Sequence, residues 1–192
     1  LEADLGFNFG KKNLLITFHP VTLETASSVK QMQALLEALV KLEDTQLIFT
    51  MPNADTDGRA LIKMVEKFAS QYSNAHVFTS LGQSRYLSCL AQVDGVVGNS
   101  SSGLLEAPFV GVPTVNIGER QRGRLLGPAV VSCTDSTKDI LAAIANARST
   151  KLQTIAAHRN TPYGKPGASA KIVNVLRSVE LDGILFKRFY ER

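Results

Sequence analysis

A strand-like run followed by three serines constrains the fold more than any other feature of this sequence. Residues 94–98 form a run typical of a buried strand, and 100–103 read Ser-Ser-Ser-Gly before a helical pattern that contains Glu106. The first turn of a helix has unpaired N–H groups and positive partial charge, which suits a phosphate. Ser100 and Ser101 could therefore bind a phosphate or simply cap the helix. Glu106 is placed to accept a hydrogen bond from a sugar hydroxyl, as an acid does in nucleotide-binding folds.

Length and composition favour one sizeable globular domain. The chain has 192 residues, of which 44% are hydrophobic and 20% are charged, an ordinary globular balance. Its net charge of +4 suits an anionic small molecule. The sequence has no basic run interleaved with aromatic residues, so we expect no nucleic-acid partner. It also lacks an apolar run of the roughly 20 residues that span a membrane, so we expect no membrane association.

The two cysteines, Cys89 and Cys133, each lie in an apolar stretch. This placement predicts buried, reduced thiols and a cytoplasmic protein. No His and Cys pattern has the spacing of a metal site, so we expect no metal. The chain begins at Leu1 rather than Met, and residues 1–9 read as a lead-in. We therefore expect a fragment of a longer chain.

Short apolar runs alternate with helical patterns along the sequence. The alternation predicts a parallel α/β sheet with helices on both faces. The predicted strands are residues 14–18, 46–51, 76–79, 95–98, 113–117 and 129–133. The predicted helices are residues 23–42, 58–72, 83–91, 103–109 and 137–148.

Unusual polar residues follow the predicted strands, at the edge where such sheets bind ligands. His19 follows the first strand directly. Its imidazole could donate a proton to a leaving phosphate, or it could only hydrogen-bond the next turn. Arg120 and Arg124 lie after the fifth strand, where guanidinium groups favour an anion, whereas we expect Arg122 between them to be solvated. Tyr86 could stack on a base or sit at the edge of the core.

Other polar residues have simpler explanations, and the C-terminal tail looks different from the rest. Asp55 and Asp57 are expected to be turn residues that cap the next helix, and His76 and His158 are expected to be structural or solvated. After a turn-rich break at 160–167, residues 170–179 carry a helical apolar stripe. The last residues are unexpectedly aromatic, which indicates a missing partner surface.

Six motifs in order then resemble one family. They are TFHPVTLE at 17–24, PNAD at 52–55, GNSSSG and EAP at 98–108, GVPTVNIG at 111–118, RQ and GR at 120–124, and YG and AS at 163–169. The chain resembles the C-terminal half of the UDP-N-acetylglucosamine 2-epimerase family. It is most similar to the hydrolysing branch that supplies N-acetylmannosamine-type sugars for sialic and legionaminic acid synthesis. At 165–167, Lys-Pro-Gly replaces the Gly-Asn pair that is commoner in the family.

The resemblance implies a fold and a set of site residues. The fold is Rossmann-like, the C-terminal half of a B-type glycosyltransferase architecture. Residues 1–192 would form a single nucleotide-sugar-binding domain with C-terminal helices at 168–192. By resemblance, Ser100 and Ser101 bind the diphosphate of UDP and Glu106 binds the ribose. Arg120 also lies at the nucleotide, and Tyr86 lies near uracil. His19 is the catalytic candidate, because the resemblance places it at the diphosphate near the scissile bond.

The implied reaction removes the proton on C2 of a UDP-sugar with anti elimination of UDP, then adds water. The family uses no metal and no nicotinamide, so no cofactor is expected. Its proton-transfer carboxylates belong to an N-terminal domain that is absent from these residues, so we expect the fragment alone to be inactive. The full-length protein is expected to be a homo-oligomer. Two alternatives remain: a glycosyltransferase domain, or a non-catalytic nucleotide-sugar-binding module.

Overall fold

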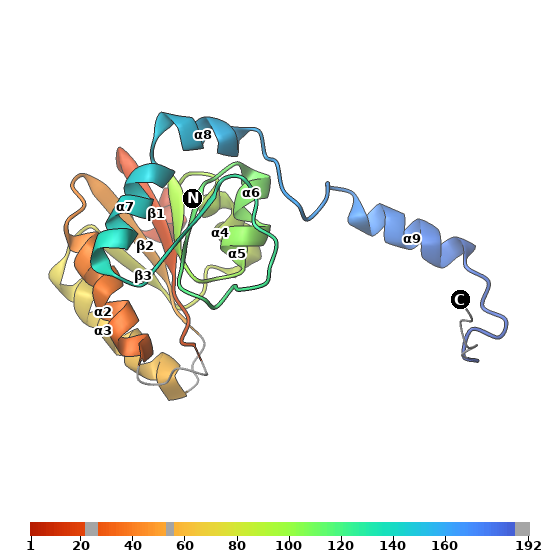
Figure 1. The fold of residues 1–192 in the computed structure, drawn as a ribbon, viewed down its shortest axis with the longest axis horizontal. Helices are drawn as coiled ribbons and strands as arrows, with labels where there is room; N and C mark the ends of the chain where they lie inside the picture. The colour runs from red at the N-terminus through yellow and green to blue at the C-terminus, as the bar shows by residue number, and fades with distance from the viewer. Residues whose placement is uncertain (22–26, 53–55, 187–192) are drawn as a thin grey trace. The chain divides into compact units, whose positions relative to one another are not determined.

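The computed structural model describes residues 1–21, 27–52 and 56–186. The chain separates into two compact units, Leu1–Pro162 and Tyr163–Arg192. The first unit is built on a six-stranded sheet, and the described part of the second contains one helix (Figure 1). Across the described residues, no helix is both long and apolar enough to span a lipid bilayer.

The six predicted strands are confirmed, and all of them run parallel. They are β1 (Lys12–Thr17), β2 (Thr45–Thr50), β3 (Ala75–Phe78), β4 (Gly95–Gly98), β5 (Thr114–Ile117) and β6 (Val130–Cys133). Their order in the sheet is β3-β2-β1-β4-β5-β6. The order reverses between β1 and β4, and doubly wound sheets bind ligands beyond the carboxyl ends of the strands at such a point.

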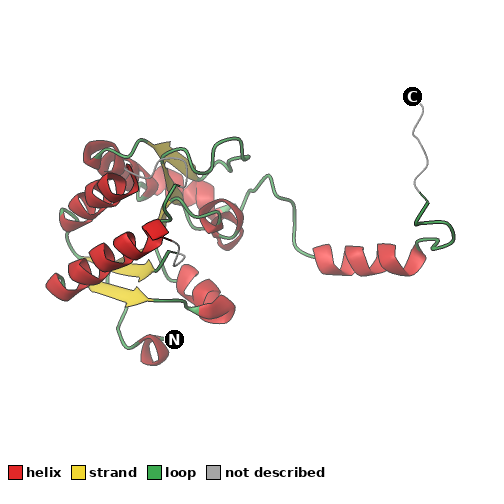
Figure 2. Cartoon of the chain, turned by 90° about the horizontal axis from the view of Figure 1, so that it is seen from below, coloured by secondary structure: helices red, strands yellow, loops and turns green. Residues whose placement is uncertain are grey.

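Helices cover both faces of the sheet, as predicted (Figures 1 and 2). The faces separate by alternation along β1, because Leu14 and Ile16 belong to one apolar cluster and Leu15 to the other. The helices that contribute to the larger cluster are α2 (Ser27–Val40), α3 (Thr56–Gln71), α7 (Thr137–Ala147) and α8 (Thr150–Ala157). The smaller cluster draws on α1 (Glu2–Leu5), α4 (Gly82–Leu90) and α6 (Ala107–Val110).

The helix predicted at 103–109 is divided in the structure. It consists of α5 (Ser102–Leu105) and α6, with Glu106 at the break between them. Pro108 lies in the first turn of α6 and has no N–H to donate to the carbonyl of Leu104. The division therefore follows from a proline in a position where it can begin a helix but cannot continue one.

Two short helices add to the predicted elements, and two predictions fall partly outside the described residues. Helices α1 and α8 were not predicted; α8 is capped by Ser149, whose Oγ accepts from the N–H of Leu152 at 3.3 Å. The predicted helix 23–42 is observed from Ser27, since 22–26 lie outside the described residues. Asp55 also lies outside them, as does the side chain of Asp57. The expectation that these two aspartates cap a helix therefore stays a prediction.

The apolar stripe at 170–179 does form a helix, α9 (Ala168–Ser178). The structure describes all of its residues, and none of them is buried. Ile172, Val175 and Leu176 are all more than half exposed. The described part of the second unit therefore carries an exposed apolar helical face.

Candidate functional site

Three loops at the carboxyl edge of the sheet converge on Asn99, the residue after β4. Oδ1 of Asn99 accepts from the backbone N–H of His19 at 2.7 Å, and its Nδ2 donates to the carbonyl of His19 at 2.8 Å. The backbone carbonyl of Asn99 accepts from Nη1 of Arg120 at 3.0 Å and from Nε2 of Gln121 at 2.7 Å. These contacts bring His19 after β1 and Arg120 after β5 together with the serine turn after β4.

Ser100 and Ser101 form the first turn that leads into α5. The carbonyl of Ser101 accepts from the N–H groups of Leu104 and Leu105, each at 2.9 Å. Ser101 is the N-cap residue of α5, yet its hydroxyl makes no capping hydrogen bond within the described chain. The Oγ of Ser100 accepts from the N–H of Ser102 at 3.4 Å. The capping alternative is therefore not met by the hydroxyl of Ser101, whereas the hydroxyl of Ser100 does accept from the first N–H of α5.

Tyr86 and Glu106 line one pocket of about 520 Å³ beside this turn. Thr50, Met51, Pro52 and Ser80 contribute to its wall at the ends of β2 and β3. The Tyr86 hydroxyl hydrogen-bonds Oγ of Ser102, which ties the pocket to the serine turn. Oε2 of Glu106 is buried and has no hydrogen-bond partner within the described part of the chain. The pocket wall thus includes an aromatic residue and a glutamate whose buried Oε2 has unused acceptor capacity.

The ring of Tyr86 is half-buried, and this burial raises the pKa of its phenol. The negative charge of Glu106 raises the pKa further, whereas the hydrogen bond to Ser102 acts in the opposite direction. Tyr86 packs at the edge of the smaller core cluster, as one alternative expected, and it also lines the pocket. Stacking of its ring on a base stays a prediction.

The loop after β5 holds the arginines. Arg120 is held by Asn99, and burial lowers the pKa of its guanidinium, with a smaller contribution from the positive charge of Arg124. Two guanidinium groups that repel each other favour an anion between them. Arg122 pairs with Glu119 at 3.7 Å, and their side chains are 83% and 74% exposed. Arg122 is therefore a solvated residue, as predicted.

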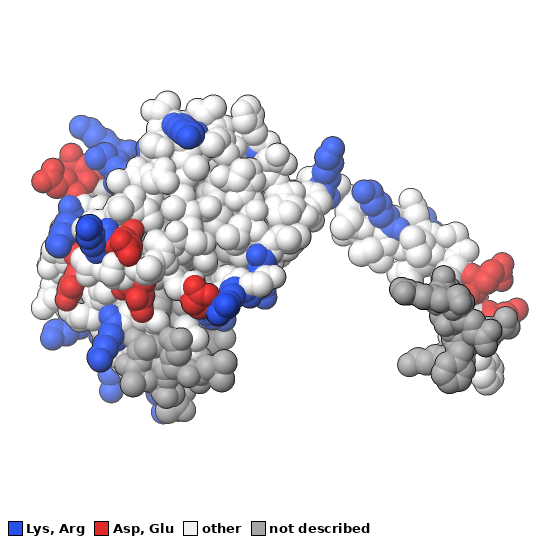
Figure 3. Space-filling model, viewed as in Figure 1, with Lys and Arg blue, Asp and Glu red and all other residues white. Residues whose placement is uncertain are grey.

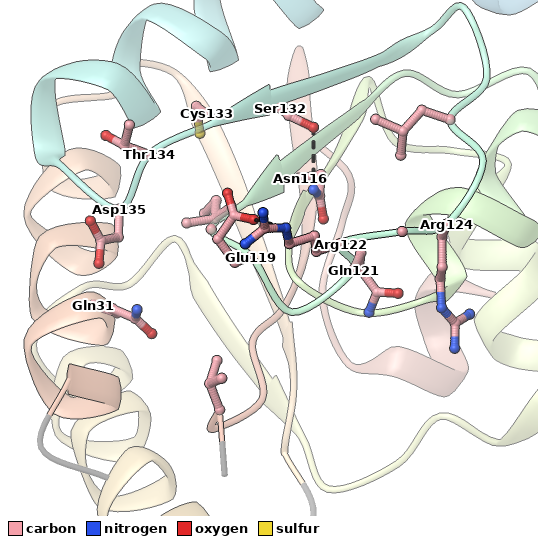
Figure 4. A pocket seen from close by; sticks show the side chains of 15 residues that line it. Gln31, Asn116, Glu119, Gln121, Arg122, Arg124, Ser132, Cys133, Thr134 and Asp135 are labelled. Atoms are coloured by element: carbon pink, nitrogen blue, oxygen red, sulfur yellow. Dashed lines mark hydrogen bonds and ion pairs between the residues drawn. The ribbon is translucent and has the colours of Figure 1, made fainter. Parts of the chain in front are cut away.

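Gln121 lines a second pocket of about 520 Å³ (Figure 4). Its wall combines Gln31 from α2, Asn116 from β5 and Ser132 from β6. The Nδ2 of Asn116 donates to Oγ of Ser132 at 3.3 Å. Oδ1 of Asn116 and Oε1 of Gln121 are buried and lack a hydrogen-bond partner among the described residues. Of the residues that line this pocket, the sequence predicts only Arg124 as an anion-binding candidate.

Of the remaining titratable candidates, Cys133 lines the second pocket. His76 stacks on Phe7 with ring centroids 4.1 Å apart and hydrogen-bonds Gln46, and burial lowers its pKa. Cys89 is a buried free thiol and Cys133 a half-buried one. No cluster of three or more His, Cys, Asp or Glu that could hold a metal occurs in the described chain. On the face drawn in Figure 3, acidic and basic side chains of the first unit are interspersed.

The fold and this edge together define a doubly wound, Rossmann-like α/β domain with its polar loops gathered at the switch point. The model of the UDP-N-acetylglucosamine 2-epimerase family matches residues 3–177, and the chain belongs to this family. The resemblance inferred from the motifs is thereby confirmed.

Named relatives and a solved structure agree with this assignment. The chain is 34% identical to the GDP/UDP-N,N'-diacetylbacillosamine 2-epimerase (hydrolyzing) of Campylobacter jejuni over 100% of this chain and 50% of that protein. It is 31% identical to the polysialic acid biosynthesis protein P7 of Escherichia coli over 99% of this chain and 50% of that protein. The chain therefore spans about half the length of these curated relatives. The UDP-GlcNAc 2-epimerase of Neisseria meningitidis, solved with UDP-GlcNAc, superposes with a TM-score of 0.68 at 19% identity, covering 86% of this chain and 44% of that one.

Proposed function

We propose that residues 1–192 are the UDP-binding C-terminal domain of a hydrolysing UDP-N-acetylglucosamine 2-epimerase. The observation that carries the proposal is Glu106, which lines a pocket and whose buried Oε2 has no hydrogen-bond partner among the described residues. A buried carboxylate oxygen without donors is costly. The vicinal hydroxyls of a ribose would supply those donors, with the base against Tyr86 in the same pocket.

The diphosphate of UDP would lie between the serine turn and Arg120. Ser100 and Ser101 offer hydroxyl donors there, and Arg120 offers guanidinium N–H groups beyond the one that Asn99 accepts. Asn99 links Arg120 directly to this turn. The positive charge of Arg124 near Arg120 adds to the attraction for an anion.

In the proposed reaction the C2–H and C1–O bonds of a UDP-2-acetamido sugar break together. A base takes the C2 proton, the electron pair forms a C1–C2 double bond, and UDP leaves. Water then adds to the glycal-type intermediate to give an N-acetylmannosamine-type sugar. His19 would act near the departing diphosphate, where an imidazolium can donate a proton.

The residues that take the C2 proton would come from an N-terminal domain of the same protein, so the 192-residue chain alone would be inactive. Two facts support this division. The chain spans about half of its curated relatives, and the α9 face leaves large apolar side chains exposed. We propose that the N-terminal domain covers that face. The family resemblance further supports a homo-oligomer, and the two free thiols support a cytoplasmic location.

The test is calorimetric titration of the 192-residue chain with UDP and with 2',3'-dideoxy-UDP. We expect UDP to bind more tightly, because only UDP can donate ribose hydroxyls to Glu106. In Glu106→Gln this preference should shrink, while the affinity for the dideoxy compound stays close to that of the unmodified chain. Equal binding of both nucleotides by the unmodified chain would contradict the assigned role of Glu106, and no binding of UDP would overturn the proposal. Product analysis with the full-length protein distinguishes the epimerase, which releases a free sugar, from a transferase, which forms a glycoside.

A further inference from the structure

Asn99 is a polar residue buried as deeply as the core, with 1% of its surface exposed. Buried carboxamides are expected to have their donors and acceptors satisfied. Asn99 uses both ends of its amide on one residue, the backbone of His19. Its own N–H donates to the carbonyl of Thr17 at 3.2 Å. Its side chain therefore continues the hydrogen bonding between β1 and β4 beyond the last paired residues of these strands.

The backbone of Asn99 makes a second set of contacts, on the side of β5. Its carbonyl accepts from Arg120 and from Gln121, whose side chain is itself buried. Asn99 also directly precedes Ser100 in the chain. Asn99 thus contacts the loop that contains His19 and the loop that contains Arg120, and it directly precedes the turn that begins at Ser100.

We propose that Asn99 is the positioning residue of this site, which fixes His19, Ser100 and Arg120 relative to one another without binding the ligand. This inference rests on the proposed function, because it assumes that the three groups act on one diphosphate. A ligand held from three separate loops needs them at matched positions within about 0.5 Å. A misplacement of about 1 Å can reduce rates on the order of 10²-fold. The arrangement around Asn99 meets this need with four hydrogen bonds to His19, Arg120 and Gln121.

The chain supplies a matched control at the opposite end of β1. Asn13 is also buried, and its side chain also bonds both backbone groups of one residue. Its Nδ2 donates to the carbonyl of Gly10 at 3.0 Å, and its Oδ1 accepts from the N–H of Gly10 at 2.8 Å. Asn13→Ala therefore removes a pair of hydrogen bonds equivalent to the pair that Asn99→Ala removes. The pair at Asn13 lies at the amino edge of the sheet, away from the candidate site.

The experiment compares Asn99→Ala, Asn99→Asp and Asn13→Ala in the 192-residue chain by urea unfolding and by calorimetric titration with UDP. We expect both alanine variants to lower the unfolding midpoint similarly, whereas only Asn99→Ala weakens UDP binding, by about 10-fold or more. Asn99→Asp keeps the acceptor for the N–H of His19 and loses the donor to its carbonyl. We expect it to fold and to bind UDP more weakly than the unmodified chain. If Asn99→Ala does not fold, the UDP affinity of Asn99→Asp tests the inference in its place.

A second readout responds to position and not to stability. In NMR spectra, UDP should shift the imidazole signals of His19 in the unmodified chain and in Asn13→Ala, and this shift should be lost or reduced in both Asn99 variants. Unchanged UDP affinity in the Asn99 variants, or equal weakening in Asn13→Ala, would overturn the inference while leaving the proposed function intact. An unmodified chain that does not bind UDP would overturn both.

Discussion

Gly98 lies so close to Thr17 that a Cβ at Gly98 would be 2.0 Å from the carbonyl oxygen of Thr17. Its φ of +139° is also outside the range that L side chains readily adopt. This contact joins the end of β4 to the end of β1 immediately before Asn99. The approach of the two strands at the switch point therefore depends on the absence of a side chain at position 98.

The first prediction is that Gly98→Ala loses about 3 kcal/mol or more of unfolding free energy, from the contact and the backbone strain together. Urea denaturation measures the change. Gly6→Ala is the control, since Gly6 has a φ of +72° but open space around its Cβ position. Its loss should be only about 1–2 kcal/mol, from the left-handed conformation alone. Equal losses in the two variants would show that the contact with Thr17 carries no cost.

The second prediction concerns charge and position in the loop after β5. Arg120→Ala should weaken UDP binding by about 1.5–3 kcal/mol, as for a charge-assisted hydrogen bond, or roughly 10- to 150-fold. Ser100→Ala should weaken it within the same range. Arg122→Ala removes an arginine from the same loop, but Arg122 is exposed and paired with Glu119. Calorimetry should find its UDP affinity almost unchanged, and a loss equal to that of Arg120→Ala would indicate a non-specific effect of charge.

The third prediction concerns alkaline pH. Burial raises the pKa of the Cys89 thiol from 9.0 to about 11. Between these values the folded chain keeps a proton that the unfolded chain has released. The contribution of Cys89 to stability is therefore complete below pH 9 and is lost as the pH rises toward 11. Chemical denaturation across this range should show a falling free energy of unfolding.

Cys89→Ala provides the comparison for the pH measurement. The variant loses core packing at every pH, but its free energy of unfolding should fall less steeply between pH 9 and 11 than that of the unmodified chain. The pKa of Cys133 is raised in the same way, with help from Asp139 and Asp135. Cys133→Ala should therefore also reduce the slope. An identical slope in all three proteins would contradict the assignment to the thiols.

The fourth prediction is that the 192-residue chain binds UDP but does not eliminate UDP from UDP-N-acetylglucosamine. Elimination needs a base for the C2 proton, and we have proposed that this base belongs to the N-terminal domain. Chromatography of UDP released over time measures the activity of the chain against that of the full-length protein. Turnover by the chain at a rate comparable with the full-length protein would place the base within residues 1–192.

The sheet could be predicted because each of its strands is a short apolar run between helical patterns. The division of the helix at Glu106 could not be read from periodicity, although Pro108 was visible as a signal for it. Helix α8 was missed since its eight residues bury mainly Leu152 and Ala156, too few for a clear stripe. The apolar stripe at 170–179 correctly predicted α9. Such a stripe does not show which surface the helix packs against.

The candidate site was predictable where polar residues follow a strand, as His19 and Arg120 do. Asn99 and Gln121 were missed, although both stood inside the motifs that identified the family. Their contacts cross 80 and 22 positions of the sequence, so only the folded sheet brings the partners together. The one local signal in the sequence was that Asn99 directly follows a strand predicted to be buried.

The strand order has a consequence for how this protein is made. β1, β2 and β3 form one half of the sheet, and the chain then returns to place β4 against the other side of β1. The residues that meet at Asn99 thus come from both halves, with Arg120 and then Gln121 the last of them to be synthesised. During translation, a nascent chain that ends before Arg120 lacks the contacts between Asn99 and the loop after β5. Nucleotide binding on the ribosome should therefore begin abruptly, once the loop after β5 has emerged from the exit tunnel.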